Sequence, residues 1–68
     1  YMDNSWVKIY TSNQFIKSEI VRQVLVDHEM NAVLMNKQDT AYKFGEVEVY
    51  IHQDNFDQAL EIIIQNDL

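Results

Sequence analysis

Cysteine and proline are absent from this chain of 68 residues, and glycine occurs once, as Gly45. Without cysteine there can be no disulfide, no thiolate zinc ligand and no cysteine nucleophile. No apolar run approaches the ~20 residues that cross a bilayer. The first residues lack the basic start and apolar middle of a signal peptide, and we expect Met2 to be the natural start. These absences predict a cytoplasmic protein with no membrane partner.

The charge balance is acidic, with 11 acidic and 5 basic residues and a formal net charge of −6. The basic residues are scattered, whereas phosphate contacts need clusters of Lys and Arg, so we expect no nucleic-acid partner. A hydrophobic content of 47% is typical of a folded chain, and the length fits one domain over residues 1–68. Because a core of this size contributes only about 3–5 kcal/mol, we expect a homo-oligomer.

Hydrophobic periodicity predicts three strands and two helices. The strands are expected at residues 6–10, 32–36 and 46–52, and the helices at about 14–29 and 54–66. Asp54 is expected to cap the start of the second helix. Asn31 is expected to adopt the left-handed conformation that commonly ends a helix.

The same periodicity assigns faces to these elements. In the third strand, alternation separates a core face from a face with Glu46, Glu48, Tyr50 and His52. The first helix is expected to expose Ser18 and to bury an apolar stripe of Ile16, Ile20, Val21, Val24 and Leu25. Phe15 and Val26 lie off that stripe, either exposed or against a partner. The second helix is expected to bury Phe56, Ala59, Leu60 and Ile63.

The element order β-α-β-β-α predicts an α+β fold. A right-handed crossover makes the first two strands parallel, and the third strand fills the gap between them, antiparallel to both. The expected architecture is a two-layer, ferredoxin-like sandwich: a three-stranded antiparallel sheet of order 1-3-2 with two helices on one face. The edge of the first strand is expected to be exposed, because a fourth strand of that fold would lie there.

Three features resemble a known family: Trp6 and Tyr10 in "WVKIY", the Asp39-bearing loop that ends at Gly45, and "ALEII" in the second helix. Over residues 6–64 the chain resembles a small bacterial family of signal-transducing proteins of unknown function, which is grouped by fold with the nitrogen-regulatory PII proteins. The resemblance implies a PII-like fold and no catalytic signature. Glu29 stands where that family often carries a helix-ending glycine, and for this reason Asn31 is the expected cap.

The segment 36–46, "NKQDTAYKFGE", connects the second and third strands. Gly45 is expected to supply a positive φ at the re-entry into the third strand. In PII proteins the equivalent connector engages partners, so the resemblance implies an analogous role by analogy alone. Two interpretations stay open: a plain connector, or a partner-binding loop that presents Asp39, Tyr42 and Lys43.

The aromatic residues of the first and third strands mark a candidate interaction surface. Alternation places Trp6, Tyr10 and Tyr50 on the sheet face away from the helices, with Val33 or Met35 beside them. Tyr and Trp are enriched in interfaces, and an exposed apolar patch usually marks an interaction site. The alternative is that these rings lie flat among charged neighbours without a partner.

Signals for chemistry are weak. His28 near the end of the first helix suits a packed histidine or one that complements the helix dipole. His52 and Glu48 share a strand face and could hold a divalent metal weakly, but the plainer interpretation is a solvated acidic face. No nucleophile elbow, paired-histidine motif or glycine-rich phosphate loop is present. We therefore expect no enzyme and no cofactor.

Two functions from different classes remain. The first is a non-catalytic regulatory or protein-interaction module in bacterial signal transduction, which binds through the sheet face or the edge of the first strand. The second is a small-ligand sensor, with a metabolite at a subunit interface near Trp6, Tyr42 and Tyr50. The expected partners are further copies of the chain, an unidentified protein or a small metabolite.

Overall fold

The computed structural model describes residues 5–38 and 45–68 of the chain. Its elements are β1 (Trp6–Ser12), α1 (Phe15–Asp27), β2 (Ala32–Asn36), β3 (Val47–His52), a 3-10 turn η1 (Gln53–Asn55) and α2 (Phe56–Gln65). The predicted order β-α-β-β-α is confirmed, with element ends that differ by a few residues. In the described part of the chain, neither helix combines the length and apolar character needed to cross a bilayer.

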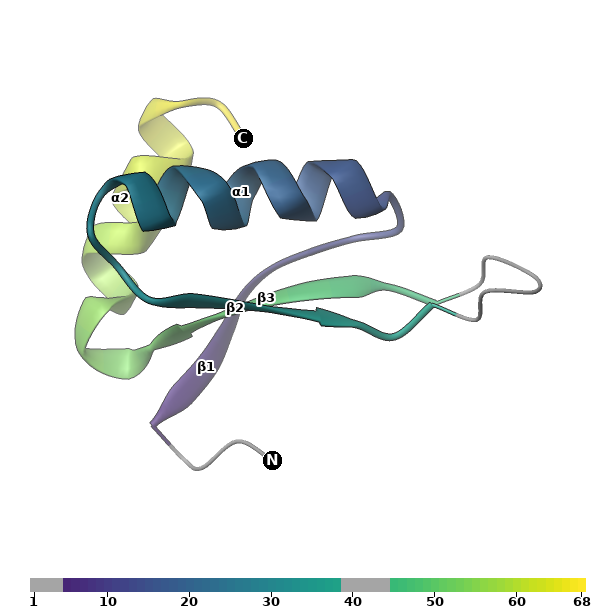
Figure 1. The fold of residues 1–68 in the computed structure, drawn as a ribbon. Helices are drawn as coiled ribbons and strands as arrows, with labels where there is room; N and C mark the ends of the chain where they lie inside the picture. Colours follow the sequence, from purple (N-terminus) through teal and green to yellow (C-terminus); the bar gives the residue numbers. More distant parts are fainter. Residues whose placement is uncertain (1–4, 39–44) are drawn as a thin grey trace.

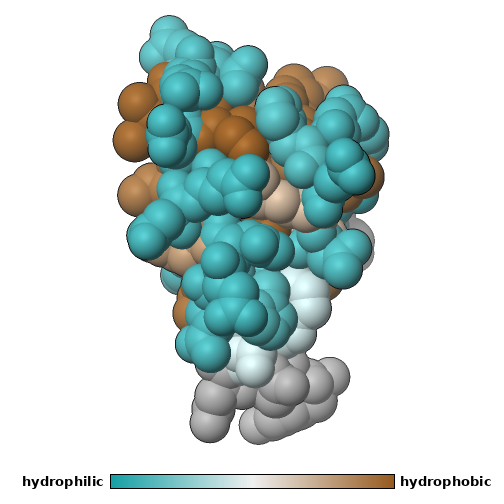
Figure 2. Space-filling view, turned by 90° about the vertical axis from the view of Figure 1, so that its left-hand side faces the viewer, coloured by the Kyte–Doolittle hydropathy of each residue, from teal (hydrophilic) through white to brown (hydrophobic). Residues whose placement is uncertain are grey.

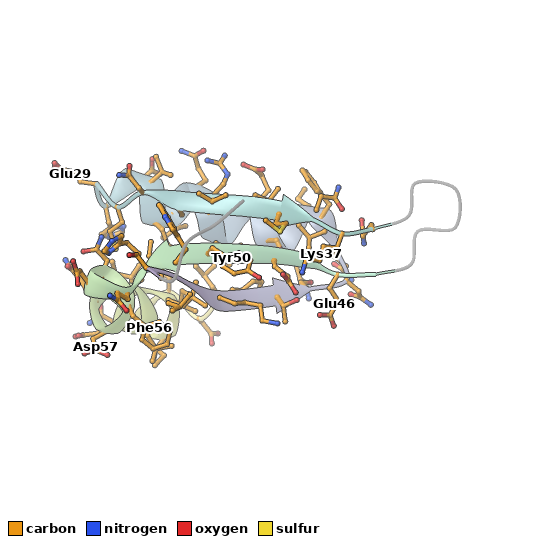
Figure 3. All side chains as sticks on the ribbon, turned by 90° about the horizontal axis from the view of Figure 1, so that it is seen from below. Glu29, Lys37, Glu46, Tyr50, Phe56 and Asp57 are labelled. Atoms are coloured by element: carbon orange, nitrogen blue, oxygen red, sulfur yellow. The ribbon has the colours of Figure 1, made fainter. Side chains whose placement is uncertain are left out.

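The sheet has three strands in the order β1-β3-β2, and β3 pairs antiparallel with both neighbours. This topology confirms the predicted α+β fold. Figure 1 shows α1 lying along one side of the sheet and α2 standing at a steep angle to it, near the end where β3 finishes. The opposite face of the sheet, which Figure 3 shows from below, carries no helix. We call it the open face.

The core forms on the helical side of β3. Val47, Val49 and Ile51 each have no exposed surface, as their alternation predicts. Val49 and Ile51 belong to one cluster with buried residues from both helices and from the turn after α1: Val21, Leu25, Met30, Ala59, Ile62 and Ile63. Both helices therefore cover the same face of the central strand.

The buried face of α1 differs from the prediction. Ser18, expected outside, has no exposed surface and donates its hydroxyl to the Val47 carbonyl oxygen at 2.7 Å. Ile16 and Ile20, expected inside, are 66% and 47% exposed. Apolar residues are spread widely around this helix, so periodicity alone does not choose its buried face. The small hydroxyl side chain allows the helix to approach β3, where it gains a buried hydrogen bond.

The second helix also departs from its predicted pattern. Ala59 and Ile63 are buried as expected, but Ile62 is buried with them and Leu60 is 38% exposed. Asp54 does not cap α2, because it lies in the η1 turn that precedes the helix. The backbone N–H of Asp54 instead donates to Nδ1 of His52 at 3.2 Å. The extra turn shifts the start of the helix to Phe56.

Both helices end in a Schellman motif that has no glycine. After α1, the N–H of Met30 bonds to the Leu25 carbonyl and that of Glu29 to the Val26 carbonyl, at 3.1 and 2.9 Å. Glu29 has φ 64°, so it, and not the predicted Asn31, is the left-handed residue. After α2, Asp67 with φ 57° has the same role, and Leu68 bonds back to Ile63. Met30 and Leu25 are both buried, which supplies the hydrophobic contact of the motif.

The chain re-enters the sheet at Gly45, which has a φ of 99° and so confirms the predicted positive φ. A Cβ at this position would lie 2.5 Å from the Lys37 carbonyl oxygen, so a side chain is excluded both by conformation and by space. The N–H of Lys37 donates to the Glu46 carbonyl oxygen at 3.0 Å and extends the β2–β3 ladder. These contacts fix the base of the connector. Asp39, Tyr42 and Lys43 lie outside the described residues.

Replacement of Glu29 by glycine should stabilise the protein. A left-handed non-glycine residue costs about 1 kcal/mol, and glycine removes that cost while losing more chain entropy on folding. We expect Glu29→Gly to raise the free energy of unfolding by about 0.5–1 kcal/mol and Tm by about 3–5 °C in a thermal melt followed by circular dichroism. Asn31→Gly is the control and should give no stabilisation. If Asn31→Gly stabilised the protein and Glu29→Gly did not, Asn31 would be the left-handed residue that ends α1.

Candidate functional site

The open face is built from all three strands. Strand register assigns side chains to it, since partners across an antiparallel pair share a face. Lys8 and Val33 both pair with Tyr50, and Thr11 and Met35 both pair with Glu48. Both Val33 and Met35 therefore join the face, where the sequence left one or the other open. Figure 3 shows Tyr50 near the middle of this surface.

A β-bulge removes Tyr10 from the open face, which corrects the prediction. The register shifts between Lys8, which pairs with Tyr50, and Tyr10, which pairs with Val49. One extra residue in β1 turns all later side chains to the other side of the sheet. Tyr10 is thus half-buried on the helical side, packed against the core. Trp6 lies before the bulge and keeps its predicted place on the open face, where it pairs with His52.

Glu48 is the centre of the open face, and its carboxylate is held by three donors. Tyr50 Oη donates to Oε1 at 2.8 Å, Lys37 Nζ lies 3.1 Å from Oε1, and Lys8 Nζ lies 3.4 Å from Oε2. Neighbouring side chains cover it, so that Glu48 is only 7% exposed although it faces away from the core. Charge-assisted hydrogen bonds of this kind are the stronger ones in proteins. Through one carboxylate the network joins β1, β3 and the residue that follows β2.

The network shifts the pKa values of Glu48 and Lys37 in opposite directions. The hydroxyl of Tyr50, and then the ammonium of Lys37, lower the pKa of Glu48 below its ordinary value of 4.5. The hydrogen bond and charge of Glu48 raise the pKa of Lys37 above its ordinary value of 10.5. Both shifts favour the charged forms, so the ion pairs persist throughout the neutral range.

An aromatic contact closes one end of the open face. The rings of Trp6 and His52 meet edge to face, with centroids 5.8 Å apart and planes at 77°. At the other end, Thr11 Oγ1 donates to Glu46 Oε2 at 2.9 Å. The polar centre therefore has an aromatic pair at one end and a second hydrogen-bonded polar pair at the other.

The two histidines have local structural partners. Nδ1 of His28, at the end of α1, donates to the Val24 carbonyl oxygen at 2.8 Å, which agrees with a helix-end role. His52 Nδ1 is the acceptor for Asp54, as described above. Across residues 5–38 and 45–68, no group of three or more His, Asp or Glu side chains is placed to hold a metal ion. The weak metal site considered for His52 and Glu48 gains no third ligand there.

A separate pocket lies on the helical side. It has a volume of about 220 Å³ and is lined by Tyr10, Lys17, Ile20, Val21, Asp67 and Leu68. It forms where β1, α1 and the C-terminal end of α2 meet. The bulge in β1 supplies one of its walls, since it turns Tyr10 toward the helices.

Sequence reasoning found part of this site and missed its centre. Trp6 and Tyr50 share the open face as predicted, although their role in binding remains a prediction. The clustering of Glu48 with Lys8 and Lys37 was missed. Alternation places Glu48 and Lys8 on one face, but only the register between β2 and β3 brings Lys37 alongside.

Glu48 should carry part of the acid sensitivity of the fold. Its folded pKa is lowered, so its contribution to stability is complete above about pH 4.5 and is lost as pH falls through the folded pKa. We expect Glu48→Gln to lower Tm at pH 7 and to flatten the fall in Tm between about pH 5 and pH 2. Glu46→Gln, which removes an exposed carboxylate from the residue just before β3, is the matched control. An unchanged acid profile in Glu48→Gln would contradict the assignment.

Comparisons of this chain with protein-family models, with curated proteins and with solved structures find no match.

Proposed function

We propose that this protein is a non-catalytic interaction module of bacterial signal transduction, and that its open face binds a protein partner. The satisfied carboxylate of Glu48 is the observation that carries the proposal. A buried charge without partners opposes complex formation, whereas a charge that already has its donors can be covered at lower cost. The open face thus combines a prepared polar centre with Trp6, Val33, Met35 and Tyr50 around it.

The composition of this surface supports a protein partner. Aromatic residues and methionine are enriched at interfaces, whereas lysine and glutamate are depleted. On the open face both types occur together, and the exposed charges of Lys8 and Lys37 are each paired with Glu48. The resemblance to the bacterial signal-transducing family supports the regulatory role, and the acidic charge argues against a nucleic-acid partner.

Photo-crosslinking in cells tests the proposal. A photoreactive amino acid at Met35 samples the open face, and one at Gln58, on the exposed side of α2, is the matched control. We expect an adduct with a protein other than this chain from Met35 and none from Gln58. With the partner in hand, Trp6→Ala should weaken binding about tenfold or more in calorimetry, and Gln58→Ala should not. Equal adduct formation from both positions would remove the open face as the binding surface.

The pocket on the helical side favours a second candidate, a small-ligand sensor. Its volume of about 220 Å³ lies below the ~300–1,000 Å³ of sites for drug-sized ligands, so it suits a small metabolite. Apolar walls and the polar groups of Tyr10, Lys17 and Asp67 resemble the usual composition of such sites. The pocket is on the opposite side of the sheet from Trp6 and Tyr50, where the ligand was first expected.

A thermal-shift screen against metabolites separates this candidate from the first. Binding to the folded state raises Tm by mass action, so a ligand present at about 100 times its Kd should stabilise by about 2.7 kcal/mol. Ile20→Trp, which fills the pocket from an exposed position on α1, should abolish the shift. Leu60→Trp, at an exposed position on α2, should leave it intact. A shift that survives Ile20→Trp would exclude this pocket as the site.

A further inference from the structure

The outer edge of β2 lacks the features that normally protect a sheet edge. The strand has five residues, Ala32–Asn36, with no charge, no proline and no bulge in its pairing with β3. The other edge strand, β1, carries Lys8 and a bulge immediately after it. Charged side chains and bulges are two devices by which proteins prevent edge-to-edge pairing. The two edges of this sheet therefore differ in their capacity to accept another strand.

The backbone pattern shows which groups that edge offers. Lys37 N–H donates to the Glu46 carbonyl oxygen, which continues the register in which Asn36 pairs with Val47. In an antiparallel pair, alternate residues bond to the neighbour and the residues between them point away. Val33 and Met35 therefore direct their backbone N–H and C=O groups toward β3, as Lys37 does. The N–H and C=O groups of Ala32, Leu34 and Asn36 point outward.

One side of α1 runs along this edge. Lys17 and Ile20 line the pocket beside Tyr10 of β1, so that side of the helix faces β1. At about 100° per residue, the opposite side, above β2, carries Phe15, Glu19, Arg22 and Val26. Phe15 and Val26 are 46% and 39% exposed. Figure 3 shows a row of α1 side chains that projects past the β2 edge.

The charge of this strip suits a second copy of the same acidic chain. Glu19 and Arg22 form an ion pair with each other, and β2 itself is uncharged, so the strip has no net charge. The net charge of −6 therefore lies on the rest of the chain, so two copies meet less close-range repulsion at this strip than at an acidic surface. Figure 2 shows hydrophobic surface concentrated in the upper part of the molecule, where the helices lie.

We propose that the β2 edge pairs antiparallel with β2 of a second copy, about a two-fold axis at Leu34. Ala32 then lies opposite Asn36 of the other copy, and the outward groups of both strands meet in register. The result is a continuous six-stranded sheet with two open faces side by side. This inference goes beyond the proposed function and does not depend on it. It specifies an interface for the homo-oligomer that the small core predicts.

The same axis brings the α1 strips together. Ser18 is bonded to Val47, which pairs with Asn36, two residues from Leu34. Two strand residues span about 6.6 Å, or four to five residues of helix, so Arg22 lies about level with the axis. Glu19 and Arg22 of both copies therefore gather around it, and each arginine can meet a glutamate of the other copy.

Charge reversal on the strip tests the dimer. Sedimentation at about 100 µM should give about 16 kDa, twice the mass of the 8.1 kDa chain. Arg22→Glu places four glutamates around the axis and should raise the dimer Kd at least about tenfold. The swap Glu19→Arg with Arg22→Glu should restore it. Lys17→Glu changes the net charge equally on the β1 side of α1 and should leave the dimer intact.

Several results would overturn the proposal. A monomer at about 100 µM would do so, and so would equal dissociation by Lys17→Glu and Arg22→Glu. The failure of the charge swap to restore the dimer would also count against it. Circular dichroism confirms that each variant is folded. A monomeric chain whose Met35 position still crosslinks to another protein would remove this inference and leave the proposed function standing.

Amide exchange gives a second readout that needs no substitution. The outward amides of Ala32, Leu34 and Asn36 should exchange more slowly as protein concentration rises, because the dimer protects them. The amides of Val33 and Met35, bonded to β3, should change little. Protection that rises equally at all five positions, or at none, contradicts pairing through this edge.

Discussion

The rest of the structure depends on the central strand β3, because its two faces are buried in different ways. Apolar side chains cover one face, and hydrogen-bonded polar groups cover the other. On one side, Val49 and Ile51 have no exposed surface and lie in the cluster that joins both helices. On the other, Glu48 is nearly as buried, yet it lies under no helix. A carboxylate in that position needs donors, and it finds them on β1, on β3 and at Lys37, just after β2. The same residues therefore hold the sheet together and prepare its open face.

The bulge in β1 separates two surfaces that would otherwise merge. Without it, Tyr10 would join Trp6 on the open face and enlarge the aromatic patch there. With it, Tyr10 turns toward α1 and forms a wall of the pocket. An irregularity of one residue thus decides which side of the sheet could receive a protein and which could receive a small molecule. Bulges are known to re-aim side chains in this way.

A small domain buries little apolar surface. This one also leaves several large apolar side chains exposed, most of them on its helices. Phe15 and Val26 lie above the β2 edge, which itself lacks charge and bulge. A second copy at that edge would add strand pairing and cover these side chains together. It would also place two open faces on one continuous sheet, an arrangement suited to a bivalent partner.

The sequence by itself determined the elements, their order and the faces of β3, because hydrophobic periodicity is a local property of the chain. It also located Gly45, whose positive φ only glycine adopts without strain. The tertiary structure alone decided which side of α1 is buried, since apolar residues surround that helix and the Ser18 hydrogen bond to β3 selects the side. It likewise decided the place of Tyr10 and the meeting of Lys37 with Glu48. Both depend on strand register, which arises only when segments distant in the sequence pair in space.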